Sequence, residues 1–96
     1  MPRGKASSSL AGKKRVRFQI EADKGAEVFV AGSFNDWNPK KHKLTYKNKV
    51  YSCTTLLSKG RHEYKFVIDG VWCVDPACSE WTPNGLGSLN SVVVVA

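Results

Sequence analysis

Apolar and polar residues alternate with a period of two along much of this chain, the pattern of β-strands that bury one face. Residues 15–21 read RVRFQIE, with an apolar side chain at every second position. Residues 27–31 form a nearly continuous apolar run, which is typical of a more central strand. Since no segment of ten or more residues has apolar positions at helical spacing, the pattern predicts an all-β protein.

Turn-forming residues divide the rest of the chain into short segments. Asp69-Gly70 is a strong hairpin signal, and residues 75–87, with two prolines and two glycines, predict a long loop. About seven short antiparallel strands at such spacing are typical of an immunoglobulin-like β-sandwich. The predicted strands cover residues 15–21, 27–31, 44–46, 50–57, 63–68, 71–74 and 89–95.

The hairpin at Asp69-Gly70 decides which neighbouring side chains share a face. With these two residues as the turn, Val67 pairs with Trp72, and successive side chains point to opposite faces. A tryptophan left in water forfeits roughly 150–250 Å² of burial at about 25 cal/mol/Å². Trp72 is therefore expected to be covered by a loop, to contact a partner protein or to bind a ligand. The predicted core face is Tyr64, Phe66, Ile68, Val71 and Cys73, and the opposite face is Lys65, Val67, Asp69, Trp72 and Val74.

A second tryptophan lies in the turn-rich loop 32–39. Such a loop cannot easily bury two large rings, so we expect Phe34 inside as an anchor and Trp37 outside. Flat aromatic faces suit sugars, because the axial C–H groups of glucose form an apolar plate while amide and ammonium groups bond the hydroxyls. The side chains available for that role are Asn35, Asn38, Lys65, Asn84 and Asn90.

The formal charge of +7 is spread unevenly. Residues 1–17 hold six of the fifteen basic residues and no acid, which leaves nine basic against eight acidic residues in the remainder. Residues 1–13 are also rich in serine and glycine, so we expect a flexible basic leader followed by a β-sandwich module over 14–96. A basic leader can touch nucleic acid or anionic lipid, but the near-neutral remainder makes a nucleic-acid partner unexpected.

The three cysteines favour an intracellular protein. Their odd number argues against the disulfide framework of a secreted domain, and the spacing of Cys73, Cys78 and the two histidines is not that of a zinc site. We therefore predict no metal and no other cofactor. The sequence starts with no signal peptide and no window approaches 18 apolar residues, so we expect a cytoplasmic location and no membrane contact.

Catalytic chemistry is not expected either. A glycosidase needs two carboxyl groups about 5–9.5 Å apart in a pocket, whereas Asp69 and Asp75 are explained by a hairpin turn and an Asp-Pro turn. No serine has a plausible histidine partner, and no phosphate-cradling loop is present. The chain is therefore predicted to have no enzyme activity and no catalytic residue.

Three ordered motifs resemble a known family: EVFVAGSFNDWNP at 27–39, GRHEYKFVIDGVWCVDP at 60–76 and GLGSLNSVVVV at 85–95. They are similar to the glycogen-binding domain of AMP-activated protein kinase β subunits, and to the modules that precede the catalytic domains of isoamylases and branching enzymes. The resemblance covers roughly residues 15–95. It implies an immunoglobulin-like β-sandwich that binds α-1,4-linked glucans such as glycogen or starch without catalysis.

The same resemblance implies a set of carbohydrate-binding residues. In that family two tryptophans stack on the sugar, flanked by a lysine, an asparagine, and an apolar and a hydroxyl residue of the last loop. Carried over by motif, these positions are Trp37, Lys65, Trp72, Leu86, Ser88 and Asn90. Trp81 lies in a stretch that departs from the family; packing over a sheet edge is favoured for it over extension of the sugar platform.

Protein partners are a further possibility for the tryptophan face. The exposed tryptophan face could dock a partner domain, as a structural or protein-interaction sandwich does, but Lys65 and Asn90 near both rings favour sugar. The resemblance also implies a glucan-active enzyme or a kinase complex as a protein partner. A role of this chain itself as a kinase scaffold or an enzyme appendage is not expected, because no kinase-binding segment or catalytic barrel follows Ala96.

Overall fold

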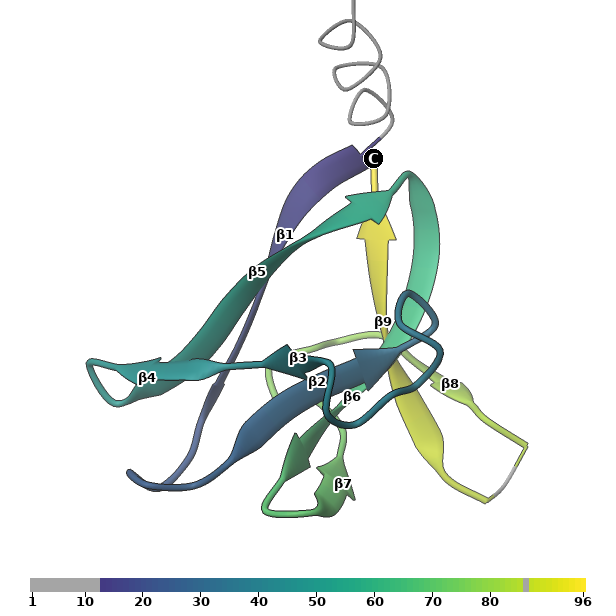
Figure 1. Cartoon of the computed structure of the whole chain (residues 1–96). Helices are drawn as coiled ribbons and strands as arrows, with labels where there is room; N and C mark the ends of the chain where they lie inside the picture. The colour runs from purple at the N-terminus through teal and green to yellow at the C-terminus, as the bar shows by residue number, and fades with distance from the viewer. Residues whose placement is uncertain (1–12, 86) are drawn as a thin grey trace, which may run out of the picture.

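A computed structural model describes residues 13–85 and 87–96 and places them in nine strands (Figure 1). All strand pairs are antiparallel. In chain order the strands are β1 (Lys13–Glu21), β2 (Val28–Gly32), β3 (His42–Lys43), β4 (Thr45–Lys47), β5 (Val50–Ser58), β6 (Gly60–Ile68), β7 (Val71–Cys73), β8 (Trp81–Pro83) and β9 (Leu89–Val95).

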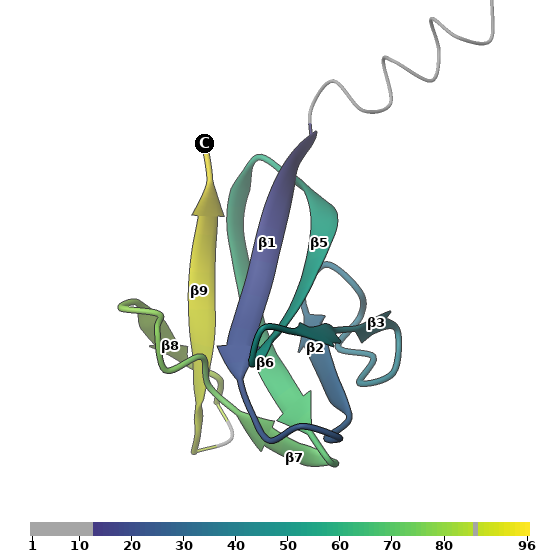
Figure 2. The same ribbon diagram turned by 90° about the vertical axis from the view of Figure 1, so that its left-hand side faces the viewer.

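The strands form two sheets that enclose the core. The first has the order β1-β5-β4; the second has the order β3-β2-β6-β9-β8, with β7 also paired to β6. Figures 1 and 2 show β1 and β5 on one side and β2, β6 and β9 on the other, and the chain passes between the sheets at the turn from β5 to β6. The predicted β-sandwich is confirmed, and all seven predicted strands are present; β3 and β8 are additional.

Inward-facing residues of both sheets fill the core, as the period-two pattern requires. Phe18 of β1 is buried in it, with its ring 5.4 Å from that of Phe34 and 4.8 Å from that of Tyr64. Phe34 packs against the buried cluster, so the expected anchor of the 32–39 loop is present. The buried members of the cluster are Phe18, Ile20, Val28, Val30, Leu44, Tyr51, Leu57, Tyr64, Phe66 and Val95.

The β6–β7 hairpin has the predicted pairing, Val67 with Trp72 and Ile68 with Val71. Two of its burial predictions are wrong. Val71 was expected in the core but is 65% exposed, because it adjoins the turn on a three-residue strand at the edge of the sheet. Val67 was expected on an exposed face but is buried, because its cross-strand partners Phe29 and Trp72 flank it on the same face.

The basic residues near the start of the chain are partly within the sheet. β1 begins at Lys13, so Lys13, Arg15 and Arg17 are exposed residues of an ordered strand. The rest of the leader predicted for residues 1–13 lies outside the described residues. Within the described ranges, no helix is long and apolar enough to cross a membrane.

Close backbone contact joins the end of β2 to β6. It sets the start of the loop predicted over 32–39, which follows β2 and is called the 33–40 loop below. Gly32 pairs with Tyr64, and Ser33 N donates to Glu63 O at 2.9 Å. A Cβ at Gly32 would overlap Glu63 O and would lie 2.6 Å from the Phe34 ring. Glycine is therefore required here by close approach rather than by its backbone angles.

A buried asparagine holds the same loop together. Asn35 Oδ1 accepts from Gly32 N at 2.9 Å, and its Nδ2 donates to Val30 O at 3.0 Å and to His42 Nδ1 at 2.8 Å. Since an amide nitrogen only donates, His42 Nδ1 must accept, which leaves the proton on Nε2, 3.3 Å from Thr55 Oγ1. This network needs a neutral His42, and burial, with Lys41 nearby, lowers the pKa of this imidazole.

Replacing Gly32 with alanine should destabilise the fold. The added methyl overlaps backbone of β6, which side-chain rotation cannot relieve, and overpacking of this kind costs about 1–3 kcal/mol. Urea denaturation should show the loss as a lower midpoint. Thr54→Ala, at an exposed position of β5, is the control and should change stability by less than about 0.5 kcal/mol; a Gly32→Ala variant as stable as this control would contradict the prediction.

The free energy of unfolding should fall as the pH drops below about 6.5. Unfolded His42 takes up a proton near that pH whereas the folded protein resists it, so acidification favours the unfolded state. In His42→Gln, which keeps a neutral hydrogen-bonding side chain, this part of the pH dependence should disappear. Denaturation curves between pH 7.5 and pH 5, about the range of histidine titration, give the free energy of unfolding at each pH. If this free energy changed with pH equally in wild type and variant, the prediction would be wrong.

Candidate functional site

An open cleft of about 590 Å³ lies over the outer face of the six-stranded sheet. It contains four of the six residues proposed from sequence, together with three that were not in that set. The lining residues are Trp37, Glu63, Lys65, Trp72, Pro83, Asn84 and Asn90. Three separate parts of the chain therefore meet here: the 33–40 loop, the β6–β7 hairpin and the β8–β9 hairpin.

Strand register places the central residues of the cleft on one face. Val67 is opposite Trp72, and Glu63 is opposite Val92. Since side chains alternate, Glu63 and Lys65 share the face of Val67 and Trp72, and Asn90 shares the face of Val92. This face points away from the three-stranded sheet, so the cleft is built outside the core.

Two tryptophans with different exposure line the cleft. Trp72 is 43% exposed and Trp37 is half-buried, so Trp37 is less open than the sequence-based expectation. Trp37 has a φ of 57°, in the left-handed region that bulky residues rarely adopt. Its backbone N donates to Gly32 O at 2.9 Å, and this bond to the end of β2 holds the strained residue in place.

The ammonium group of Lys65 is tied to the last loop. Lys65 Nζ donates to Ser88 Oγ. Ser88 is held in turn by Asn84, whose N donates to Ser88 O at 3.1 Å and whose Nδ2 lies 3.3 Å from Ser88 Oγ. An ammonium has three donors, so two N–H groups of Lys65 remain for a ligand. Ser88 thus contacts Lys65 but is not among the described residues that line the cleft.

The remaining sequence-based candidates have varied placements. Leu86 lies outside the described residues. Asn35 is 4% exposed and bonds to Gly32, Val30 and His42. Asn38 Oδ1 accepts from Lys40 N at 2.9 Å. Neither asparagine lines the cleft. Asn90 does line it, although only 6% of its surface is exposed.

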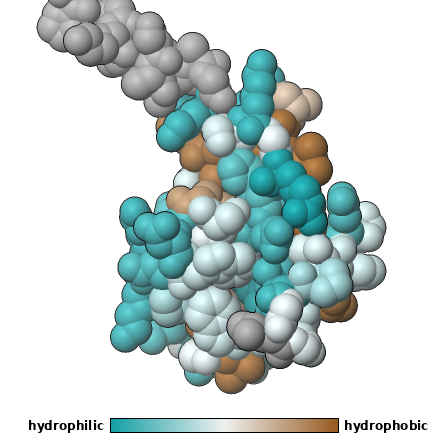
Figure 3. All heavy atoms as spheres, turned by 90° about the vertical axis from the view of Figure 1, so that its right-hand side faces the viewer, coloured by the Kyte–Doolittle hydropathy of each residue, from teal (hydrophilic) through white to brown (hydrophobic). Residues whose placement is uncertain are grey.

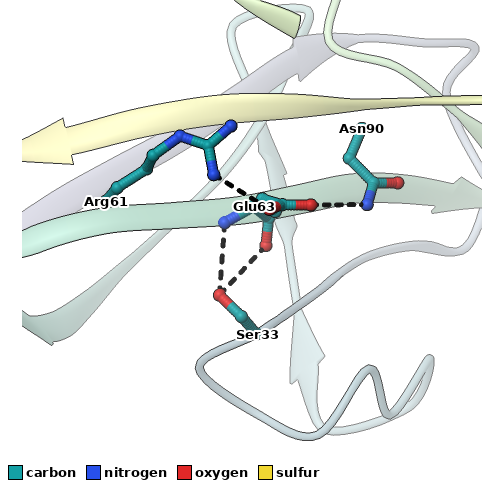
Figure 4. Close-up of polar contacts among 4 residues, drawn as sticks. All are labelled: Ser33, Arg61, Glu63 and Asn90. Carbon is teal, nitrogen blue, oxygen red and sulfur yellow. Dashed lines mark hydrogen bonds and ion pairs between the residues drawn. The ribbon is translucent and has the colours of Figure 1, made fainter. Parts of the chain in front are cut away.

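Sequence reasoning missed Glu63, which is central to the polar contacts of the site (Figure 4). Its Oε1 accepts from Asn90 Nδ2 at 2.9 Å, and its Oε2 accepts from Arg61 Nη1 at 3.0 Å. Ser33 Oγ also accepts from Glu63 N at 3.2 Å. The sequence did contain a signal for Glu63. The side-chain alternation that places Lys65 on the outer face of the strand places Glu63 on the same face.

The third tryptophan is separated from the cleft by the sheet. Trp81 pairs with Ser91, which is fully buried and lies on the face opposite to Asn90. Trp81 is 48% exposed on the edge strand β8 and does not line the cleft. This position agrees with the sheet-edge role favoured over an extended sugar platform.

A buried polar network supports β6 from the core side. Tyr64 donates to Asp75 Oδ2 at 2.7 Å, and Asp75 N donates to Ser91 Oγ at 2.8 Å. Burial, and then the hydrogen bond to Asp75, raise the pKa of Tyr64 far above its ordinary value, so its hydroxyl stays a neutral donor. The network ties the segment after β7 to β9 and β6, which carry Asn90 and Lys65.

The lining of the cleft combines aromatic, amide and charged side chains. Its described lining includes a single carboxylate, whereas glycoside hydrolysis uses two. The described residues also contain no group of three or more His, Cys, Asp or Glu side chains that could hold a metal ion. Two aromatic faces, a lysine, amides and a carboxylate can together stack on sugar rings and exchange hydrogen bonds with hydroxyls.

One side of the molecule is mainly hydrophilic. Figure 3 shows the side that faces right in Figure 1, where β8 and the 33–40 loop lie. Strongly hydrophobic residues form only small, separate patches in this view.

Comparison with known proteins agrees with this geometry. Residues 14–96 match the family described as the glycogen recognition site of AMP-activated protein kinase. The chain is 38% identical over 71 residues to 5'-AMP-activated protein kinase subunit beta-1 of Sus scrofa, covering 74% of this chain and 56% of that protein. The beta-1 subunit of Homo sapiens is 37% identical and the beta-2 subunit of Mus musculus 38% identical, again over 74% of this chain but over 25% and 26% of those proteins.

This chain thus spans about half of the first relative and about a quarter of the other two. The match includes all of β2 to β9 and nearly all of β1. The resemblance inferred from the three sequence motifs is confirmed. The chain belongs to the family of glycogen recognition domains of AMP-activated protein kinase.

Proposed function

We propose that this domain binds α-1,4-linked glucan chains, such as those of glycogen or starch, in the cleft and without catalysis. The observation that carries the proposal is the meeting of Trp37 and Trp72 with Lys65 and Asn90 in one cleft, from three separate parts of the chain. Membership of the glycogen recognition family supports the same substrate class.

In the proposed complex, Trp37 and Trp72 stack on successive glucose units of a curved chain. Lys65 and Asn90 hydrogen-bond the hydroxyls between them. Each ring covers only one side of a sugar, so its contribution is about 1–2 kcal/mol before ordering costs. Affinity for a short oligosaccharide should be modest, roughly micromolar to millimolar, and a polymer with many sites raises the apparent affinity.

The last loop completes the proposed site. Leu86 is assigned an apolar contact with the sugar from the family motif alone. Ser88 acts through its hydrogen bond to Lys65, which directs the ammonium group. Asn84 braces Ser88 and lines the cleft as well.

The remaining assignments concern the whole protein. We propose that residues 14–96 form the binding module, that the protein has no enzyme activity of its own, and that it acts in the cytoplasm. The relatives are named as subunits of a kinase, which supports a kinase complex as a protein partner; a glucan-active enzyme is the alternative. A partner domain on the tryptophan face is the competing function, and the presence of Lys65 and Asn90 in the same cleft favours sugar over it.

Replacing either cleft tryptophan with alanine should weaken binding of maltoheptaose and β-cyclodextrin roughly 5- to 30-fold, since each ring supplies about 1–2 kcal/mol of stacking. Trp81→Ala is the matched control, because Trp81 is similarly exposed but lies on the opposite face of the sheet. It should change the affinity less than ~2-fold, consistent with a residue that does not contact the ligand.

The indole N–H signals in NMR titrations measure all three tryptophans in one experiment. The signals of Trp37 and Trp72 should shift saturably with sugar and that of Trp81 should not. If no indole signal moved at millimolar sugar, the glucan proposal would be wrong, and the same face would then be tested as a protein-docking surface.

A further inference from the structure

The side chain of Asn90 is held in one orientation by a carboxylate. Asn90 Nδ2 donates to Glu63 Oε1 at 2.9 Å (Figure 4). An amide can usually be turned over, since its oxygen and nitrogen have nearly the same shape. A carboxylate ion only accepts hydrogen bonds, so the NH₂ group must face Glu63 and the carbonyl oxygen must face away.

The oxygen of Asn90 is free to accept from a ligand. In Figure 4 it points away from Glu63, and no hydrogen bond within the described part of the chain uses it. Every fully buried side-chain nitrogen or oxygen atom in that part has a partner. Because the oxygen of Asn90 has no partner, it is not fully buried. Asn90 lines the cleft although only 6% of the residue is exposed, so this oxygen is the group that the cleft can reach.

Glu63 is itself fixed by contacts on several sides. Arg61 Nη1 donates to its second carboxylate oxygen at 3.0 Å. Its backbone N and O both bond to Ser33, at the start of the loop that carries Trp37. The carboxylate therefore joins β9 to β6, while the same residue joins β6 to the tryptophan loop.

We propose that Glu63 is a positioning residue, which makes Asn90 a hydrogen-bond acceptor for a glucan hydroxyl. The inference rests on the proposed function and specifies which residue of the cleft accepts a hydrogen bond from the sugar. Lys65 and Asn90 are the residues directly beyond the last β6–β9 pair, Tyr64 with Ser91, and both line the cleft. Since the ammonium of Lys65 can only donate, the cleft offers a donor and an acceptor on neighbouring strands. A sugar hydroxyl can give its proton to Asn90 Oδ1 and accept one from Lys65, which defines how the chain lies in the cleft.

A charge swap between the two residues tests this role. Asn90→Asp sets two carboxylates face to face and should weaken maltoheptaose binding more than ~10-fold. Glu63→Gln removes the constraint on Asn90, and loss of one directed hydrogen bond should cost about 3–10-fold. The double variant Glu63→Gln/Asn90→Asp restores the pair, because the amide introduced on β6 can donate to one oxygen of the carboxylate introduced on β9 while the other oxygen faces the cleft. Its affinity should return to within about 3-fold of wild type.

Two controls accompany the swap. Glu80→Gln makes the same charge change at an exposed residue that does not line the cleft, and it should bind like wild type. The side-chain NH₂ signals of Asn90 should move in sugar-free Glu63→Gln, which reports the contact even if Asn90→Asp does not fold.

The outcomes separate this inference from the proposed function. If wild type binds maltoheptaose and the double variant binds no better than Asn90→Asp, the positioning role of Glu63 is overturned. If Asn90→Asp does not fold, unchanged Asn90 signals in Glu63→Gln overturn it instead. If wild type does not bind glucan at all, the proposed function fails, and this role fails with it.

Discussion

The pairing of β6 with three neighbours is the constraint on which the rest of this structure depends. β6 pairs with β2, β7 and β9, and its inward residues Tyr64 and Phe66 are buried in the core. The outward residues of the same strand, Glu63 and Lys65, form the floor of the cleft. Core packing and the cleft lining thus use opposite faces of one strand, so a change in its register would exchange them.

The walls of the cleft are held by polar contacts that exist before any ligand arrives. Asn35 closes the loop that carries Trp37, Ser88 directs Lys65, and Glu63 directs Asn90. Groups that are already ordered lose little conformational entropy when they bind. This matters for the proposed complex, in which each sugar ring is covered on one side only and the gain from burial is small.

Contacts of the surrounding loop also explain how the left-handed backbone at Trp37 is maintained. A tryptophan with φ of 57° is strained, and its loop is held by two backbone bonds to Gly32 O and by the side chain of Asn35. Strained residues persist where the surrounding structure over-determines them, often at ligand sites. Here the surroundings are Gly32, which admits the close approach to β6, and the neutral His42 that accepts from Asn35.

Local sequence determined the strands, the Asp69-Gly70 hairpin and its pairing of Val67 with Trp72, because alternation and turn chemistry act over a few residues. The three motifs likewise identified the family and the residues Trp37, Lys65, Trp72 and Asn90 that the structure brings together. Tertiary structure alone decided that Val71 is exposed and Val67 buried, that Trp81 faces away from the cleft, and that Glu63 meets Asn90. These outcomes depend on which distant strands become neighbours and on where a sheet ends. The alternation of residues along a single strand carries no information about either.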